Sequence, residues 1–224
     1  PYPYRAGDGR EGGERGATRV VRGASHDDPP DDLRVTIRRF YEHRGVDFQG
    51  LGRALMQDII TRSAKQGAST ITQQLVKQAF EATDDRTVLQ KVREIAAAYH
   101  IEQQWTKDKI LTEYLNTVYF GSGAYGVEAA ARTYFESNHP GCGTDETPCA
   151  EVLTPAEAAL MAGIIQNPYG YDPKINPEAA LLRRNTVLQK MLEQGFITQD
   201  QYDEGIKEAL PAASEISPPK IDSE

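Results

Sequence analysis

The chain has 224 residues, a formal net charge of −8 at pH 7, 39% hydrophobic residues and two cysteines. This length suits one large domain or two small ones with a buried core, and the acidic balance argues against a general nucleic-acid-binding protein. No run of about eighteen apolar residues occurs, so the sequence predicts no membrane-spanning helix, and no signal peptide is evident.

Residues 1–37 differ in composition from the rest of the chain. They contain six glycines, four prolines and many charged residues, but few large apolar ones. Burial of so few apolar groups does not offset the entropy lost on ordering the segment. We therefore predict a disordered or non-native segment over 1–37, a folded domain over 38–212 and a linker over 213–224.

The stretch GASTITQQLVKQ, from Gly67 to Gln78, combines small polar residues with amides and a lysine. Ile71 and Leu75 have the spacing of a buried helical stripe, and Ser69 or Thr70 is the expected N-cap. Three polar residues at three- and four-residue spacing share another face: Thr70, Gln73 and Lys77. That face suits an extended anion such as a phosphate or a carboxylate. The residues alone leave open an amphipathic surface helix with a polar cap.

Hydrophobic periodicity predicts helices on both sides of this stretch. One runs from about Gln49 to Ser63, and another from Arg86 to about Gln104. The second is expected to bury one face, formed by Val88, Val92, Ile95 and Tyr99. A third helix ends near Asn116 and is followed by a glycine-rich turn over 121–126. Its expected core positions are Ile110, Leu111, Tyr114 and Leu115.

Local capping signals predict the remaining helices. Thr154 and Glu157 form a capping box with proline at the first helical position, and Asn176-Pro177 opens a helix that Gly195 ends. Thr198 begins a last short helix. Cys142 and Cys149 flank a short polar loop, and we favour a disulfide between them over free loop thiols or a zinc site. A disulfide would indicate a location outside the cytoplasm.

Several motifs resemble the signatures of the peptidoglycan glycosyltransferases, the lysozyme-like polymerase domain of class A bifunctional penicillin-binding proteins. The stretch from Gly67 to Gln78 is similar to G-x-S-T-I-T-Q-Q-L-x-K-N, with Gln78 in place of the last Asn. Phe40, His43 and Gly45 resemble the end of the first signature, QKVRE the third, and ILTEYLN the fourth. The resemblance implies a mainly α fold, a single lysozyme-like helical domain.

The family's activity gives expected roles to residues of this chain. The resemblance implies a membrane-associated bacterial enzyme of cell-wall synthesis that polymerises lipid II into glycan strands, with Glu94 as a catalytic carboxylate. It also implies substrate contacts from Ser69, Thr70, Gln73, Lys77, Lys91, Asn116 and Tyr119. No cofactor is required by the resemblance, which leaves open a divalent cation, Mg²⁺ or Mn²⁺, at the substrate pyrophosphate.

The implied partners are lipid II, the growing glycan strand and the membrane surface, and no nucleic acid is expected. The implied location is the extracytoplasmic face of the bacterial cytoplasmic membrane. A transpeptidase domain is expected downstream in such proteins and is absent from this chain.

One departure concerns the chemistry. Thr36-Ile37 stands where the first signature has Glu-Asp, so activity is expected to be impaired. Either the chain is a degenerate member of this family, or the residues before Arg38 do not represent the native sequence of this region. The alternatives in function are a catalytically silent lipid II-binding scaffold and a lysozyme-like hydrolase, which would use two carboxylates flanking the bond.

Overall fold

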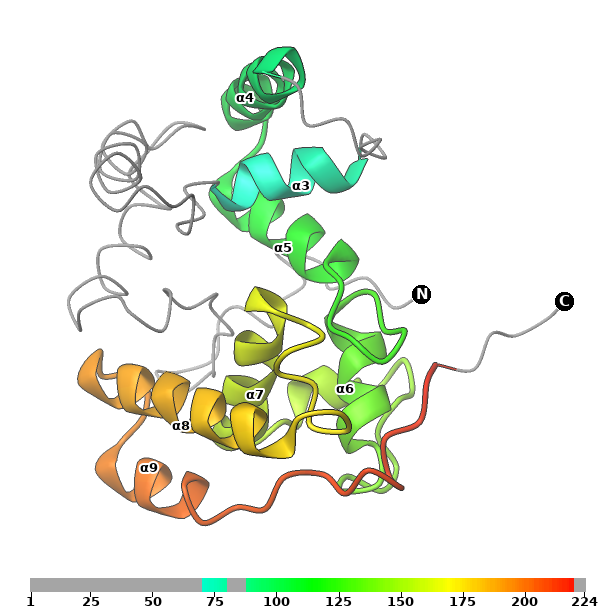
Figure 1. Cartoon of the computed structure of the whole chain (residues 1–224), viewed down its shortest axis with the longest axis vertical. Helices are drawn as coiled ribbons and strands as arrows, with labels where there is room; N and C mark the ends of the chain where they lie inside the picture. Colours follow the sequence, from blue (N-terminus) through cyan, green and yellow to red (C-terminus); the bar gives the residue numbers. More distant parts are fainter. Residues whose placement is uncertain (1–69, 80–87, 220–224) are drawn as a thin grey trace, which may run out of the picture. The chain divides into compact units, whose positions relative to one another are not determined.

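The computed structural model describes residues 70–79 and 88–219, apart from the side chains of 88–91. All regular elements in these ranges are helices, so the predicted mainly α fold is confirmed. The predicted segment 1–37 and the predicted helix near 49–63 lie outside the described residues. The helices (Figure 1) are α3 (Ile71–Ala79), α4 (Val88–Gln104), α5 (Lys107–Thr117), α6 (Val127–Phe135), the short 3₁₀ helix η2 (Cys149–Glu151), α7 (Pro155–Gln166), α8 (Pro177–Glu193) and α9 (Gln199–Gly205).

The described residues belong to two compact units that divide after Thr117. Of the described helices, α3, α4 and α5 belong to one unit, and α6 to α9 with η2 belong to the other. The domain limits expected from the sequence, 38 and 212, stay predictions.

In the first unit, α3 packs against both α4 and α5. The buried apolar residues described in this unit are Leu75 (7% exposed), Val76 (1%), Ala98 (0%), Ile110 (0%) and Tyr114 (1%). The predicted buried face of α4 is wrong for two of its residues, since Val92 is 55% exposed and Tyr99 is 51% exposed. The face that is buried instead contains Ala98, whose small side chain allows close approach between helices.

In the second unit, α7 and α8 form the main apolar contact. Every residue of α7 from Ala156 to Ile165 is buried, and all of them except Glu157 are apolar or glycine, as expected for a helix in the core. Small residues let α8 approach closely. A Cβ atom added at Gly163 would lie 2.9 Å from Cγ of Arg183. The cluster between the helices contains Ala156, Ala159, Ala162, Val187, Leu188, Met191 and Ile197.

The predicted caps of this unit are confirmed. The Thr154 hydroxyl accepts from the Glu157 amide at 3.2 Å, and Glu157 accepts from the Thr154 amide at 2.9 Å. Thr198 begins α9 with a second capping box. Gly195 follows α8 with φ of 73°, a left-handed conformation in which glycine carries no steric penalty.

A loop between α6 and α7 is closed by the predicted disulfide between Cys142 and Cys149. The buried Glu128 carboxylate accepts hydrogen bonds from the amides of Cys149 at 2.9 Å and Ala150 at 2.8 Å. These amides begin η2 and have no partner within that short helix. The disulfide and Glu128 therefore fix both ends of the loop to α6.

The segment after α9 also packs against this unit, although part of it was predicted to be a linker. Ile216 is 2% exposed, and its carbonyl accepts from Nζ of Lys174 at 3.1 Å. The Ser217 amide donates to the Thr133 carbonyl at 3.2 Å. Arg184 joins α8 to the end of α9 by donating to the carbonyls of Glu208 and Ile206.

Candidate functional site

Thr70 begins the helix that carries most of the predicted binding residues. Its hydroxyl accepts from the Gln73 amide at 3.2 Å, and its carbonyl accepts from the Gln74 amide at 3.0 Å. Thr70 is therefore the N-cap of α3, as the sequence predicts. Ser69, the alternative cap and a predicted contact, lies outside the described residues.

The exposed and buried faces of α3 differ from the expectation. The buried residues are Thr72, Gln73, Leu75 and Val76, whereas Ile71 is only partly buried. Gln73 is 4% exposed, and Lys77 in the last turn is exposed. The two predicted substrate contacts thus have different surroundings. Lys77 is open to an anion as the structure stands, while Gln73 is largely covered.

Polar side chains of α3 have partners on α5. The Tyr114 hydroxyl donates to the Gln74 side chain at 3.3 Å. The Thr117 hydroxyl lies 3.1 Å from the Gln78 side chain and 2.7 Å from the Glu113 carbonyl of its own helix. Because both contacts advance along the two helices together, α3 and α5 have the same general chain direction, and they cross at an angle (Figure 1). Gln78, the one departure within the second signature, therefore helps to anchor α3 on α5.

The third signature lies on α4, in the same unit. Lys91 is part of this helix, but its side chain is outside the described residues. Glu94, the predicted catalytic carboxylate, is partly buried, so it sits at the edge between the packed face and solvent. Asn116, near the end of α5, is also partly buried.

Two further contacts join the helices of this unit. The Thr72 hydroxyl donates to Oε1 of Glu102, and Nζ of Lys107 donates to Oε2 of the same carboxylate. Burial lowers the pKa of Lys107, and the hydrogen bond and charge of Glu102 act in the opposite direction. Glu102 is not among the site residues predicted from the sequence. No local signal marks it, since Thr72 precedes it by 30 residues.

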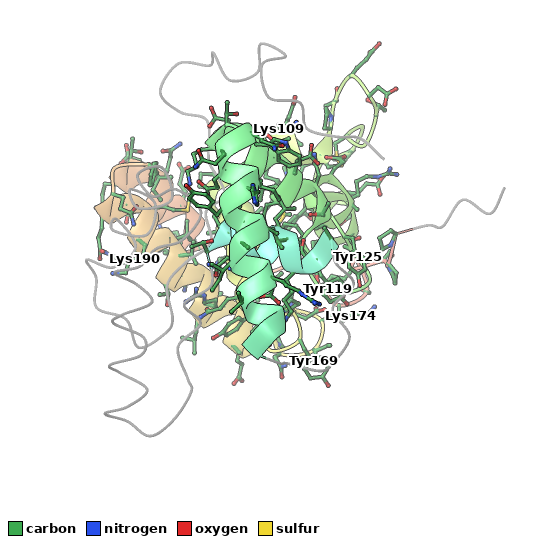
Figure 2. All side chains as sticks on the ribbon, turned by 90° about the horizontal axis from the view of Figure 1, so that it is seen from above. Lys109, Tyr119, Tyr125, Tyr169, Lys174 and Lys190 are labelled. Atoms are coloured by element: carbon green, nitrogen blue, oxygen red, sulfur yellow. A yellow bond between two sulfur atoms is a disulfide. The ribbon has the colours of Figure 1, made fainter. Side chains whose placement is uncertain are left out.

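Tyr119, the last predicted contact, belongs to the second unit. It is 37% exposed and lies beside Tyr125, with ring centroids 4.7 Å apart (Figure 2). An isolated antiparallel bridge joins these two residues across the glycine-rich turn. Within this turn Gly121, Ser122 and Gly123 all have positive φ, and Ser122 is the only non-glycine among the described residues to do so.

A buried carboxylate supports this turn. Asp172 is 1% exposed and accepts from the Ser122 hydroxyl at 2.7 Å and from the Lys174 amide at 2.8 Å. The Tyr134 hydroxyl lies 3.4 Å from Asp172 and donates to the Phe120 carbonyl at 3.1 Å. Burial, with the Asp172 charge as a smaller cause, raises the pKa of Tyr134 well above its ordinary value.

No group of three His, Cys, Asp or Glu residues in the described part of the chain could hold a metal ion. None of the described helices is both long enough and apolar enough to cross a bilayer.

Comparisons with known proteins place these features in context. A family model described as Transglycosylase matches residues 35–192. Penicillin-binding protein 1A of Neisseria flavescens is 42% identical over 189 residues, covering 82% of this chain and 22% of that protein. Penicillin-binding protein 1A of Escherichia coli K12 is 42% identical over 188 residues, covering 82% of this chain and 21% of that protein.

Solved structures are also similar to part of this chain. The crystal structure of penicillin-binding protein 1A from Haemophilus influenzae matches with 30% identity and a TM-score of 0.36, covering 61% of this chain and 16% of that chain. The chain spans 21–22% of the length of the curated relatives named above.

Proposed function

The chain belongs to the transglycosylase family, and from this premise we propose that it is a peptidoglycan glycosyltransferase domain that acts on lipid II. The proposed reaction joins disaccharide units into a glycan strand. The acceptor's C4 hydroxyl attacks the anomeric carbon of the donor, and the lipid pyrophosphate leaves. Such a step needs a carboxylate near the attacking hydroxyl and positive charge near the leaving pyrophosphate.

The observation that carries the proposal is the packing of α3 against α4. This contact brings the second signature, with Thr70 and Lys77, into one unit with the third signature, with Lys91 and Glu94. The exposed ammonium of Lys77 is suited to a pyrophosphate oxygen, because a charge-assisted contact to phosphate is among the stronger polar interactions. In the proposal, Lys91 shares this role and Glu94 assists the leaving group.

The remaining predicted contacts keep their roles as parts of the proposal. Ser69, Thr70 and Gln73 would supply neutral donors to the substrate, although the Gln73 side chain would have to become exposed. Asn116 would contribute from the end of α5. Tyr119 would contact the saccharide from the glycine-rich turn, where its exposed ring is available.

We further propose that the reaction is slow in this chain. Thr36-Ile37 replaces the expected Glu-Asp, and neither side chain accepts a proton at neutral pH. Both residues fall within the family match, which begins at residue 35, but outside the described structure. The same substitution favours the second candidate, a scaffold that binds lipid II without polymerising it.

The partners and the location belong to the proposal as well. We propose that the domain meets lipid II and the glycan strand at the extracytoplasmic face of the cytoplasmic membrane; the disulfide supports a compartment outside the cytoplasm. A Mg²⁺ or Mn²⁺ ion bound to the pyrophosphate stays part of the proposal. EDTA in the assay tests it, since loss of polymer that Mg²⁺ restores would support the ion.

The test is incubation of the chain with labelled lipid II in detergent, followed by gel separation and a binding measurement. Glycan polymer above the level given by heat-denatured chain would support the transferase. Saturable lipid II binding without polymer would favour the scaffold. Release of soluble muropeptides from finished glycan would identify a hydrolase and overturn the proposal.

A further inference from the structure

The ends of three helices meet at the carboxylate of Glu102. This residue lies in the last turn of α4, and its side chain is 2% exposed. One carboxylate oxygen accepts a hydrogen bond from the hydroxyl of Thr72, in the first turn of α3. The other oxygen accepts a hydrogen bond from Nζ of Lys107, the first residue of α5. A single side chain therefore connects the beginnings of two helices to the end of a third.

The contact of Glu102 with Thr72 and Lys107 is not expected to add much net stability. A buried ion pair must offset the desolvation of both charges, and apolar residues of similar volume often serve equally well. Thr72 is 0% exposed, so its hydroxyl is desolvated and its hydrogen bond to Glu102 replaces one to water. What the contact supplies is specificity, because a buried hydroxyl and a buried carboxylate satisfy each other at only one relative placement of their helices.

Two buried apolar side chains nearby, Val76 and Ala98, form no directional bonds. The hydrogen bonds of Gln74 and Gln78 hold α3 to α5, so the directional contact between α3 and α4 described here is the one from Thr72 to Glu102. A slip of one residue would move α3 by about 1.5 Å along its axis and rotate its side chains by about 100°. The Thr72–Glu102 bond would then be lost, whereas much of the apolar contact would remain.

The helices held in this way carry the proposed catalytic residues. Thr70 and Lys77 flank Thr72 on α3, and Glu94 lies two turns before Glu102 on α4. The placement of α3 on α4 therefore sets the separation between the proposed pyrophosphate contact Lys77 and the proposed catalytic carboxylate Glu94. A reaction with one group at the leaving oxygen and another near the reacting centre is sensitive to that separation.

We propose that Glu102 is a positioning residue, which through Thr72 and Lys107 sets the register of α3 on α4 for the transfer reaction. The expected effect on the transfer reaction rests on the proposed function. The effect of Glu102 on the register of α3 and α4 rests only on the packing of the three helices. Glu102 acts through its neighbours and is not assigned a contact with substrate.

The sharpest test is a pair of identical substitutions within this unit. Thr72→Val removes the hydroxyl that joins α3 to α4 and keeps the side-chain shape. Thr112→Val makes the same change at another buried threonine, whose hydroxyl donates to the Asp108 carbonyl of its own helix at 2.8 Å. Both changes remove one buried hydroxyl, but only the first removes a contact between helices.

We expect kcat for lipid II polymerisation to fall about 10- to 100-fold in Thr72→Val, with KM much less affected. We expect Thr112→Val to remain within about twofold of the parent. Thr72→Ser keeps the hydroxyl and should restore kcat. Glu102→Gln keeps a hydrogen-bonding group towards both partners and should be far more active than Glu102→Ala. Equal kcat values in Thr72→Val and Thr112→Val would overturn the inference.

A second readout does not depend on activity. Spin labels at two exposed positions, Ala79 on α3 and Gln103 on α4, report the separation of the helices in the full chain. The distance distribution should shift or broaden in Thr72→Val and stay unchanged in Thr112→Val. If the parent chain makes no polymer, the proposed function fails, and the spin-label distances alone test whether Glu102 sets the register of α3 on α4. Unchanged distances in both variants would overturn that inference.

Discussion

Within each of the two units, one helix contact shows a different mix of apolar packing and hydrogen bonds. Between α7 and α8 the contact is apolar, with small residues of α7 facing larger ones of α8 such as Leu188. Between α3 and its neighbours, hydrogen bonds link Thr72, Gln74 and Gln78 to α4 and α5. Apolar packing gives most free energy per contact, whereas buried polar pairs give little net stability but fix geometry. The α7–α8 pair is thus built for stability, and the α3–α5 unit for placement of the proposed site.

The largest effect on stability is expected from the α7–α8 contact. Leu188 is 0% exposed, so Leu188→Ala should lower the free energy of unfolding by about 2–5 kcal/mol, from lost transfer energy and the cavity left behind. Chemical denaturation followed by circular dichroism measures it. Leu182→Ala is the matched control on the same helix, since Leu182 is 69% exposed. A loss at Leu188 no larger than at Leu182 would remove the distinction between the two units.

A smaller effect, on binding rather than folding, is expected in the α3–α5 unit. Lys77→Ala should weaken binding of a lipid pyrophosphate by about 1.5–3 kcal/mol, the size of a hydrogen bond to a charged group. The melting temperature should hardly change, because Lys77 is exposed. Isothermal titration with lipid II measures the affinity, and Lys109→Ala, at a labelled exposed lysine of α5 (Figure 2), is the control. If Lys77→Ala binds lipid II with the affinity of the parent chain, Lys77 does not contact the pyrophosphate.

The smallest effect is a pH dependence in the second unit. Burial is the main cause of a raised pKa at Glu208, which accepts the Thr154 hydroxyl at 2.9 Å. A raised pKa means that its protonated form is favoured in the folded chain, so this contribution to stability is present below the ordinary pKa of 4.5 and is lost as pH rises through the folded value.

Glu208→Gln should therefore stabilise the chain slightly at pH 7 and leave its stability unchanged below pH 4.5. Urea unfolding at both pH values measures this difference. Glu204→Gln, at an exposed glutamate of α9, controls for the change in net charge. A stabilisation of equal size in both variants would trace the effect to net charge rather than to burial.

What the sequence could predict was mostly local. The Thr154 capping box, the N-cap at Thr70 and the glycine stop at Gly195 each depend on residues within one helical turn, and all are confirmed. The disulfide also joins residues close in sequence, with a separation of 7. Motif resemblance led to the right family for the same reason, since each signature is a short contiguous run.

What the sequence could not predict depends on partners far along the chain. Periodicity predicts a buried face of α4 formed by Val88, Val92, Ile95 and Tyr99. Val92 and Tyr99 are exposed, and the packed side contains Ala98 and the polar Glu102, which accepts from Thr72. Hydrophobic periodicity assumes that polar residues face water, and a buried polar pair breaks that assumption. Asp172 was missed likewise, since Ser122 precedes it by 50 residues.

The measurement that tests the account most directly compares glycan synthesis before and after the missing carboxylates are restored. The unmodified chain should bind lipid II but polymerise it slowly, and Thr36→Glu with Ile37→Asp should raise the initial rate by up to about 10²–10⁴, the range that a positioned general base contributes. Rates are read from labelled lipid II entering polymer on a gel. Full activity in the unmodified chain would contradict the account and direct the search for the base first to Glu42. Lipid II binding with no polymer from either form would leave only a scaffold.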